Sequence, residues 1–169
     1  MSAAVLSIGS NIGDRLGYLR GCVMMLGDAV YAASPVYETA PWGGVEQDEF
    51  LNAVLLVDDP DADAQQWLRR GQRCEDAAER TREVRWGPRT LDVDVIDVAR
   101  THRSDPHLTL PHPRAHQRAF VLVPWLDAQP DAVLPGYGTV ADLVAALPDA
   151  QRRGLRRRDD LALGSLESP

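Results

Sequence analysis

Runs of apolar residues, each closed by turn-forming residues, divide the first part of the chain into a strand and a helix. The aliphatic run over residues 3–8 ends in the Gly-Ser-Asn turn of residues 9–11 and predicts a buried first strand. Apolar positions then recur at helical spacing over residues 16–26, and Asp14 precedes them as a helix cap. The turn lacks the spacing of a phosphate-binding loop, so we expect residues 9–11 to have a structural role.

Two more strands and a second helix are predicted from the next apolar runs. Residues 30–39 and 50–57 have the apolar composition of strands. The residues between them, 40–49, are glycine-rich, acidic and numerous for a hairpin turn, so we expect a binding loop or lid. Asp63 and its neighbours can cap a helix whose apolar stripe begins at Trp67.

The last third of the chain is predicted to be mostly helical with a charged end. Residues 114–126 and 140–147 have helical patterns, and Thr139 can cap the second of these helices. The length is that of a single domain, which we expect over residues 1–150. We expect residues 151–169 to form a charged tail that packs little and can be disordered.

A strand with two carboxylates on one face is predicted near residue 93. Aliphatic residues alternate there with Asp92 and Asp94, and side chains two residues apart in a strand point to the same face, about 6.6 Å apart. Carboxylates held this close repel unless a cation neutralises them, and Mg²⁺ prefers such oxygen ligands. The alternative is a surface strand with a solvated acidic face. We expect Asp97 to lie on the opposite face and to end the strand rather than bind metal.

Composition limits the classes of partner. The formal net charge of the 169 residues is −7 and the pI is near 5.0, so a phosphate site must be a local basic cluster, and nucleic acid is not an expected partner. No signal peptide is recognisable, and no stretch approaches the roughly 20 apolar residues of a membrane span. The two cysteines form no C-x-x-C pair. We therefore expect a cytoplasmic protein without a membrane partner.

A segment with two arginines directly precedes the predicted strand of Asp92 and Asp94, and together they form one sequence motif. The residues from Arg85 to Ile96 match, at every position, a basic residue followed by x-G-P-R-x-x-D-aliphatic-D-aliphatic-aliphatic. This pattern resembles the signature of the 6-hydroxymethyl-7,8-dihydropterin pyrophosphokinases of folate synthesis. Further agreements run in order from the first strand to about residue 135. The resemblance implies that ATP donates its β,γ-diphosphate as a unit to a pterin hydroxymethyl oxygen and leaves AMP.

The resemblance also implies a fold and a set of site residues. The fold is α/β (α+β), a ferredoxin-like, mixed and largely antiparallel sheet with helices packed on both sides. Asp92 and Asp94 would hold two Mg²⁺ ions with ATP as co-substrate, and Arg80 and Arg89 would be catalytic. The residues implied to bind ATP are Gln72, Glu75, Arg82, Arg85, His112 and Arg118. The residues implied to bind the pterin are Thr39, Trp42, Asn52 and Phe120.

Other interpretations stay open beside this one. A ferredoxin-like module could bind nucleotide without turnover, and a generic two-metal phosphohydrolase could use the same acidic strand. Metal dependence separates the transferase from the binding module, and release of AMP rather than ADP or phosphate separates it from the hydrolase. A zinc site is disfavoured because the histidine spacing fits no zinc motif; those histidines are His102, His107, His112 and His116. We expect a monomer whose partners are the small molecules ATP and pterin.

Overall fold

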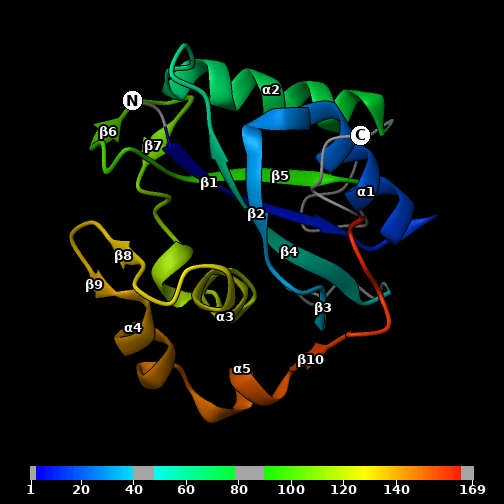
Figure 1. Ribbon diagram of the computed structural model, residues 1–169. Helices are drawn as coiled ribbons and strands as arrows, with labels where there is room; N and C mark the ends of the chain where they lie inside the picture. The colour runs from blue at the N-terminus through cyan, green and yellow to red at the C-terminus, as the bar shows by residue number, and fades with distance from the viewer. Residues whose placement is uncertain (1–2, 40–47, 79–89, 165–169) are drawn as a thin grey trace.

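Strand β1 (Ala3–Ser10) lies inside the sheet because its apolar run is buried on both faces. It pairs antiparallel with β4 (Phe50–Asp58) and with β5 (Asp92–Val98). The computed structural model describes residues 3–39, 48–78 and 90–164. The other strands of this sheet are β2 (Val30–Ala33), β3 (Tyr37–Thr39) and β10 (Leu155–Arg157). Within the described residues the strand order is β10-β3-β4-β1-β5, with β2 also paired to β4 (Figure 1).

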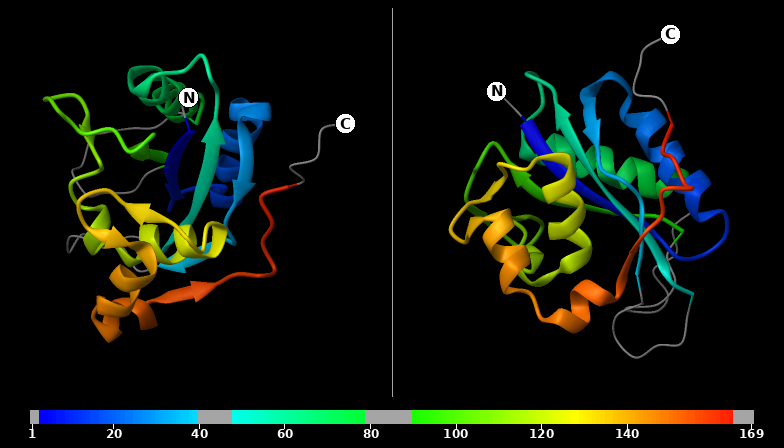
Figure 2. Two further views of the ribbon diagram at one scale, coloured as in Figure 1. Left: turned by 60° about the vertical axis from the view of Figure 1, so that its left-hand side comes forward. Right: turned by 60° about the horizontal axis from the view of Figure 1, so that its bottom comes forward.

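Helices cover both faces of the sheet (Figure 1, Figure 2). One face carries α1 (Arg15–Leu26) and α2 (Ala64–Ala77), and the other carries α3 (Ala119–Ala128) and α4 (Val140–Ala146). Each face has its own hydrophobic core, with Trp67 of α2 buried in the first and Trp125 of α3 buried in the second. The predicted antiparallel sheet with helices on both sides is therefore confirmed.

Short elements complete the described part of the chain. They are the helix α5 (Asp149–Arg153), the 3-10 turns η1 (Gly27–Ala29) and η2 (Ala115–Gln117), and two ribbons, β6 (Arg103–Ser104) with β7 (Thr109–Leu110) and β8 (Val133–Leu134) with β9 (Gly138–Thr139). The helix caps predicted at Asp14, Asp63 and Thr139 are present, each accepting a backbone N–H three residues on. In the described ranges no helix has the length and apolar character needed to cross a membrane.

The predicted strand over residues 30–39 is divided into β2 and β3 at Ser34 and Pro35. Proline has no N–H to donate to a neighbouring strand. Ser34 keeps the chain attached to β4, because its N–H donates to the Val54 carbonyl at 2.9 Å and its hydroxyl accepts the Val54 N–H at 2.8 Å. The chain therefore stays paired to β4 on both sides of the interruption.

A bulge in β5 decides which face Asp97 occupies. Val5 of β1 pairs with Asp97, and Ile96 is left as an extra residue in β5. Val5 and Ile96 both pack in the core beneath α3. Paired residues share a face of the sheet, so Asp97 lies on the α3 side, as Asp94 does. The expectation that Asp97 faces the opposite side is wrong, because the extra residue shifts the alternation.

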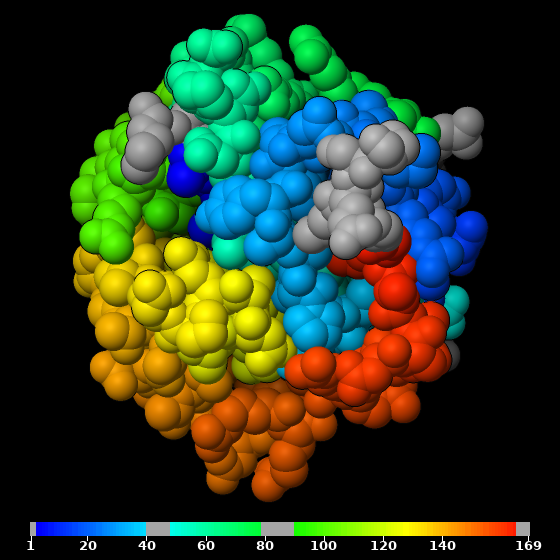
Figure 3. Space-filling model, in the orientation of Figure 1, coloured from blue at the N-terminus to red at the C-terminus, as the bar shows by residue number. Residues whose placement is uncertain are grey.

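The C-terminal segment packs on the domain as part of the sheet. Strand β10 pairs antiparallel with β3, and the N–H of Arg158 donates to the Val36 carbonyl at 2.8 Å. Figure 3 shows this segment, in orange and red, lying along the surface beside the light-blue residues of β2 and β3. The expectation of a tail that packs little is wrong for residues 155–158, because β3 offers them an edge with which to pair.

Candidate active site

Asp92 and Asp94 project from the same face of β5. Asp92 pairs with Gly9 and Asp94 with Ser7 of β1, so the pairing is continuous across both carboxylates. Both residues are half-buried. The two carboxylates therefore lie side by side on the face that α3 partly covers, as the alternation in the sequence predicts.

One row of paired residues crosses four strands beside these carboxylates. Asp92 pairs with Gly9, Gly9 with Asn52 of β4, and Asn52 with Tyr37 of β3. Neighbouring strands lie about 4.8 Å apart, so the backbones of Asp92 and Asn52 are about 10 Å apart across Gly9. The fold thus brings a predicted metal ligand and a predicted pterin-binding residue to one face of the sheet.

Glycine at position 9 leaves room for the side chain of Asn52. A Cβ atom on residue 9 would lie 2.7 Å from Oδ1 of Asn52 and 3.5 Å from the carbonyl oxygen of Leu51. The amide of Asn52 therefore lies directly against the backbone of β1. The sequence predicted a structural role for residues 9–11, but it did not indicate this contact, because Asn52 is far away along the chain.

Asn52 is buried and its amide has a fixed orientation. Its side chain lies in a polar part of the sheet and the residue is only 4% exposed. Nδ2 donates a hydrogen bond to Oγ1 of Thr39 at 2.7 Å, and Oδ1 lies over Gly9. Thr39 is also buried. An amide held in this way presents a defined pattern of donors and acceptors, which suits recognition of a polar heterocycle.

Arg118, directly before α3, connects the acidic strand to Phe120. Its Nη1 lies 3.7 Å from Oδ2 of Asp94, and its guanidinium carbon lies 5.5 Å from the centre of the Phe120 ring. Burial lowers the pKa of Arg118, and the charge of Asp94 opposes this shift. An arginine stays charged under such conditions. The structure therefore brings together three predicted site residues, Asp94 of β5 and Arg118 and Phe120 at the start of α3.

His112 is held as a neutral imidazole next to this group. Burial and the charges of Arg118 and Arg114 lower its pKa from 6.5 to about 4, although Asp92 acts in the opposite direction. Its Nδ1 accepts the backbone N–H of Arg114 at 3.2 Å, and the backbone N–H of His112 donates to the Ile96 carbonyl at 2.8 Å. In a neutral imidazole with Nδ1 as acceptor, Nε2 carries the proton. His112 can therefore donate a hydrogen bond without adding a charge.

The low pKa of His112 predicts a loss of stability in mild acid. In the unfolded chain the imidazole regains its ordinary pKa, so between pH 6.5 and 4 the unfolded state binds more protons than the folded state. The free energy of unfolding should therefore fall as the pH falls through this window, by about 2–3 kcal/mol in total. Urea unfolding at several pH values should show a shallower pH dependence in His112→Gln. If the free energy of unfolding depended on pH equally in the parent protein and in His112→Gln, the low pKa of His112 would be contradicted.

Glu75 of α2 binds the outer edge of the acidic strand. Its carboxylate is buried, with the residue 4% exposed, and Oε2 accepts the backbone N–H of Val93 at 3.1 Å. A Cβ on Gly71, one turn earlier, would lie only 3.0 Å from Cγ1 of Val93, so α2 packs closely on β5. Val93 stands between the two aspartates. The contact between Glu75 and the backbone of Val93 was not predicted from the sequence, where its one signal is an acidic residue within the apolar stripe of a helix.

The remaining predicted residues divide into two groups. Gln72 is exposed on α2, one turn before the contact between Glu75 and β5. Five residues lie outside the described part of the chain: Trp42, Arg80, Arg82, Arg85 and Arg89. Among the described residues, which include all four histidines, no three His, Cys, Asp or Glu side chains gather as a metal site.

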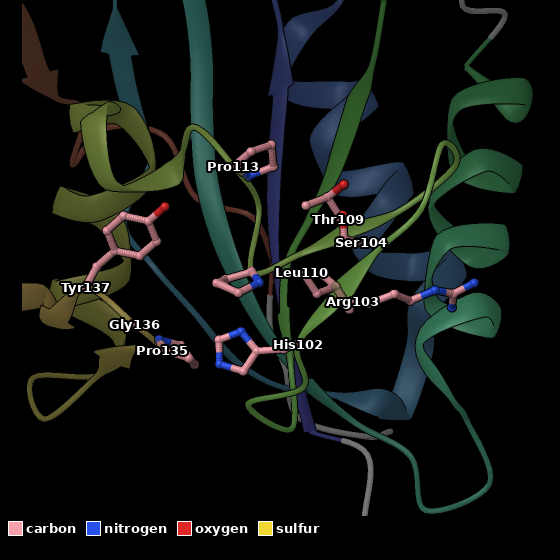
Figure 4. Close-up of a pocket in the computed structure, with 10 residues that line it drawn as sticks. His102, Arg103, Ser104, Thr109, Leu110, Pro113, Pro135, Gly136 and Tyr137 are labelled. Atoms are coloured by element: carbon pink, nitrogen blue, oxygen red, sulfur yellow. The ribbon is translucent and has the colours of Figure 1, made fainter.

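A separate cavity of about 530 Å³ lies between the ribbon β6–β7 and the turn that contains Gly136 (Figure 4). Its wall includes His102, Tyr137 and three prolines. The ring of Tyr137 stacks on His116 with 4.1 Å between the ring centres. None of the predicted site residues in the described ranges lines this cavity.

Comparisons with known proteins point to one family. A family model described as 7,8-dihydro-6-hydroxymethylpterin-pyrophosphokinase (HPPK) matches residues 5–130. The chain is 52% identical over 168 residues to a 2-amino-4-hydroxy-6-hydroxymethyldihydropteridine pyrophosphokinase of Mycobacterium tuberculosis, covering 92% of this chain and 89% of that protein. It is 41% identical over 125 residues to a protein of the same name from Bacillus subtilis, covering 72% and 74% of the two chains.

Solved structures show the same fold at low sequence identity. A crystal structure of Plasmodium falciparum HPPK-DHPS with pterin and p-hydroxybenzoate matches 92% of this chain with a TM-score of 0.66 and 11% identity. A structure of HPPK-DHPS in complex with substrates matches with a TM-score of 0.70 and 12% identity. The chain spans 45% and 46% of the lengths of those two proteins.

Proposed function

The chain belongs to the 7,8-dihydro-6-hydroxymethylpterin-pyrophosphokinase family, and from this premise we propose that it transfers the β,γ-diphosphate of ATP to 6-hydroxymethyl-7,8-dihydropterin, giving the pterin diphosphate and AMP. The main structural support for this proposal is the row of paired residues formed by Asp92, Gly9 and Asn52 on neighbouring strands. This row, with Asp94 two residues further along β5, places an oriented amide and a pair of carboxylates on one face of the sheet, at a separation that a pterin with its hydroxymethyl group can span.

The pterin-binding part of the site is built on β3 and β4. The amide of Asn52, oriented by Thr39, hydrogen-bonds the polar edge of the ring. Phe120, half-buried beside Arg118, offers an aromatic face for stacking. Trp42 belongs to the same set through the resemblance and lies outside the described residues.

The small space above Gly9 predicts a loss of pterin affinity in Gly9→Ala. The new Cβ would push the Asn52 amide out of its position, because 2.7 Å is far below an ordinary contact. We expect the Kd for the pterin to rise about tenfold while the protein stays folded. Titration by pterin fluorescence measures the affinity. Gly21→Ala is the matched control, since a Cβ at that position meets nothing within 4 Å; equal affinities of the two variants would contradict the prediction.

The phosphate-binding part lies on β5 and before α3. Asp92 and Asp94 fit Mg²⁺, because a pair of half-buried carboxylates completed by substrate phosphates is the usual way this ion is held. When bound, two such ions neutralise the triphosphate and polarise the attacking hydroxyl. Arg118 adds charge for the phosphates, and the Nε2 proton of His112 is a neutral donor to them.

The other proposed ATP ligands follow from the resemblance. They are Gln72, Glu75, Arg82 and Arg85, with Arg80 and Arg89 as the residues that stabilise charge on the transferred group and the leaving AMP. Preorganised positive charge of this kind is the main source of catalysis in phosphoryl transfer. We also propose that the protein acts as a monomer in the cytoplasm and binds no nucleic acid, in keeping with its net charge of −7.

Product analysis tests the proposed reaction directly. The protein is mixed with Mg²⁺, ATP and 6-hydroxymethyl-7,8-dihydropterin, and the nucleotides and pterins are separated by chromatography. AMP and pterin diphosphate in equal amounts are expected. ADP or inorganic phosphate would instead indicate a kinase or a phosphohydrolase, and ATP binding without any product would indicate a binding module.

A further inference from the structure

We propose that Arg156 and Arg158 of β10 are positioning residues for the pterin pocket. They fix β3 in place, and through β3 they fix Thr39 and the amide of Asn52. The proposal rests on the assignment of Thr39 and Asn52 to pterin binding made above.

Strand β10 removes the free edge that β3 would otherwise have. Leu155 pairs with Thr39 and Arg156 pairs with Glu38, and β3 pairs on its other side with β4. An edge strand of three residues has unpaired backbone groups and few contacts to hold it. The strand that carries Thr39 is therefore held by hydrogen bonds on both sides, and one of those sides is the C-terminal segment.

Arginine side chains add a second link between β10 and β3, through Glu38. Glu38 is buried, at 6% exposed, and its carboxylate accepts hydrogen bonds from Arg15 at 2.8 Å, from Arg158 at 3.1 Å and from Arg156. Burial alone would raise the pKa of Glu38, but the hydrogen bond from Arg15 and the three guanidinium charges hold it below its ordinary value. A buried carboxylate is costly without such partners, so β3 is anchored where the arginines lie.

The same arginines also hold the beginning of β4. Arg156 Nη2 lies 2.8 Å from Oε2 of Glu49, and Arg15 Nη1 donates to the Glu49 carbonyl at 2.8 Å. Glu49 directly precedes Phe50, which pairs with Thr39. The cluster of Arg15, Arg156 and Arg158 therefore joins β3 and β4 at the end of the sheet where the proposed pterin-binding residues lie.

Removal of Arg156 and Arg158 should weaken pterin binding more than it lowers the free energy of unfolding. The side chain of Arg156 is 61% exposed, and Arg15 still donates to the buried Glu38 carboxylate when Arg156 and Arg158 are replaced, so we expect the double variant to stay folded. Displacement of a binding group by a fraction of an ångström can nevertheless weaken binding strongly, because hydrogen bonds depend steeply on geometry. The hydrogen bond between Asn52 and Thr39, at 2.7 Å, is the contact that such a shift would lengthen.

Steady-state kinetics of the double variant Arg156→Ala/Arg158→Ala test the proposal. We expect KM for the pterin to rise about tenfold, with kcat and KM for ATP within about twofold of the parent protein. The double lysine variant should recover part of the loss, since it keeps the charges. Arg153→Ala, an exposed arginine in α5, is the matched control and should leave all three constants unchanged. If the double variant does not fold, Arg156→Ala alone provides the test.

The variant Asn52→Ala, measured in parallel, distinguishes the positioning role of the arginines from the assignment of Asn52 to pterin binding. A raised pterin KM in Asn52→Ala with an unchanged KM in the double arginine variant would overturn the positioning role and leave the pterin site standing. An unchanged pterin KM in Asn52→Ala would overturn the site, and the positioning role with it. A fall in kcat and in melting temperature at constant pterin KM would mean that the arginines only stabilise the fold, and that result also overturns the proposal.

Discussion

Replacing Asp94 with asparagine is expected to lower kcat for diphosphate transfer about a thousandfold. The substitution keeps the shape of the side chain and removes one of the two carboxylate charges that we propose hold Mg²⁺ on this face of the sheet. It also removes the charge partner of Arg118, 3.7 Å away. The measurement is the rate of AMP formation over a range of Mg²⁺ concentrations, and the variant should need more Mg²⁺ to reach its own maximum.

Asp97→Asn is the matched control for this prediction. Asp97 lies in the same strand and on the same face, but three residues beyond Asp94. Burial raises the pKa of its carboxyl group, so an amide of nearly the same shape should be tolerated there. We expect its activity to stay within about twofold of the parent protein. A large loss in both variants would show that carboxylates on this strand matter to the fold rather than to metal binding.

Replacing Asn52 with alanine is expected to lower kcat/KM for the pterin about a hundredfold. The buried amide of Asn52 is held in a fixed orientation by Thr39 at the row through Gly9, and its loss would leave polar atoms of the proposed ligand without partners. The affinity for ATP alone should not change. Isothermal titration with each substrate separately distinguishes these effects from a general loss of folding.

Substitutions of Thr39 provide a graded check on the same amide. Thr39→Val removes the oxygen that accepts the hydrogen bond from Asn52, and Thr39→Ser keeps it. We expect the pterin affinity to fall about tenfold in the valine variant and less than twofold in the serine variant. A hundredfold loss in Asn52→Ala together with no loss in Thr39→Val would mean that the amide needs no orientation by β3.

The sequence was most informative where structure depends on neighbouring residues. Asp14, Asp63 and Thr139 cap helices as predicted, because a cap requires only a short polar side chain and a backbone N–H three residues away. The shared face of Asp92 and Asp94 follows in the same way from the period of a strand. The resemblance of residues 85–96 to a known signature added the family, which the relatives confirm.

Several features depended on contacts between distant segments and were missed or mistaken. Asp97 was assigned to the wrong face because a one-residue bulge in β5 appears only when β1 is beside it. The C-terminal arginines looked like a solvated tail, since their partner Glu38 lies 118 residues away from Arg156. The contact of Glu75 with the backbone of Val93 likewise requires α2 to pack on the edge of the sheet.

The sequence by itself determined the family, the reaction, the antiparallel sheet with helices on both faces and the paired carboxylates. Strand periodicity predicts the paired carboxylates, and the resemblance carried by one contiguous segment, residues 85–96, implies the family, its fold and its reaction. Only the tertiary structure decided that Gly9 makes space for the amide of Asn52, that Thr39 orients that amide, and that β10 closes the edge of β3. Strand register and side-chain packing create these contacts between residues that are far apart in the chain, and local sequence patterns therefore do not predict them.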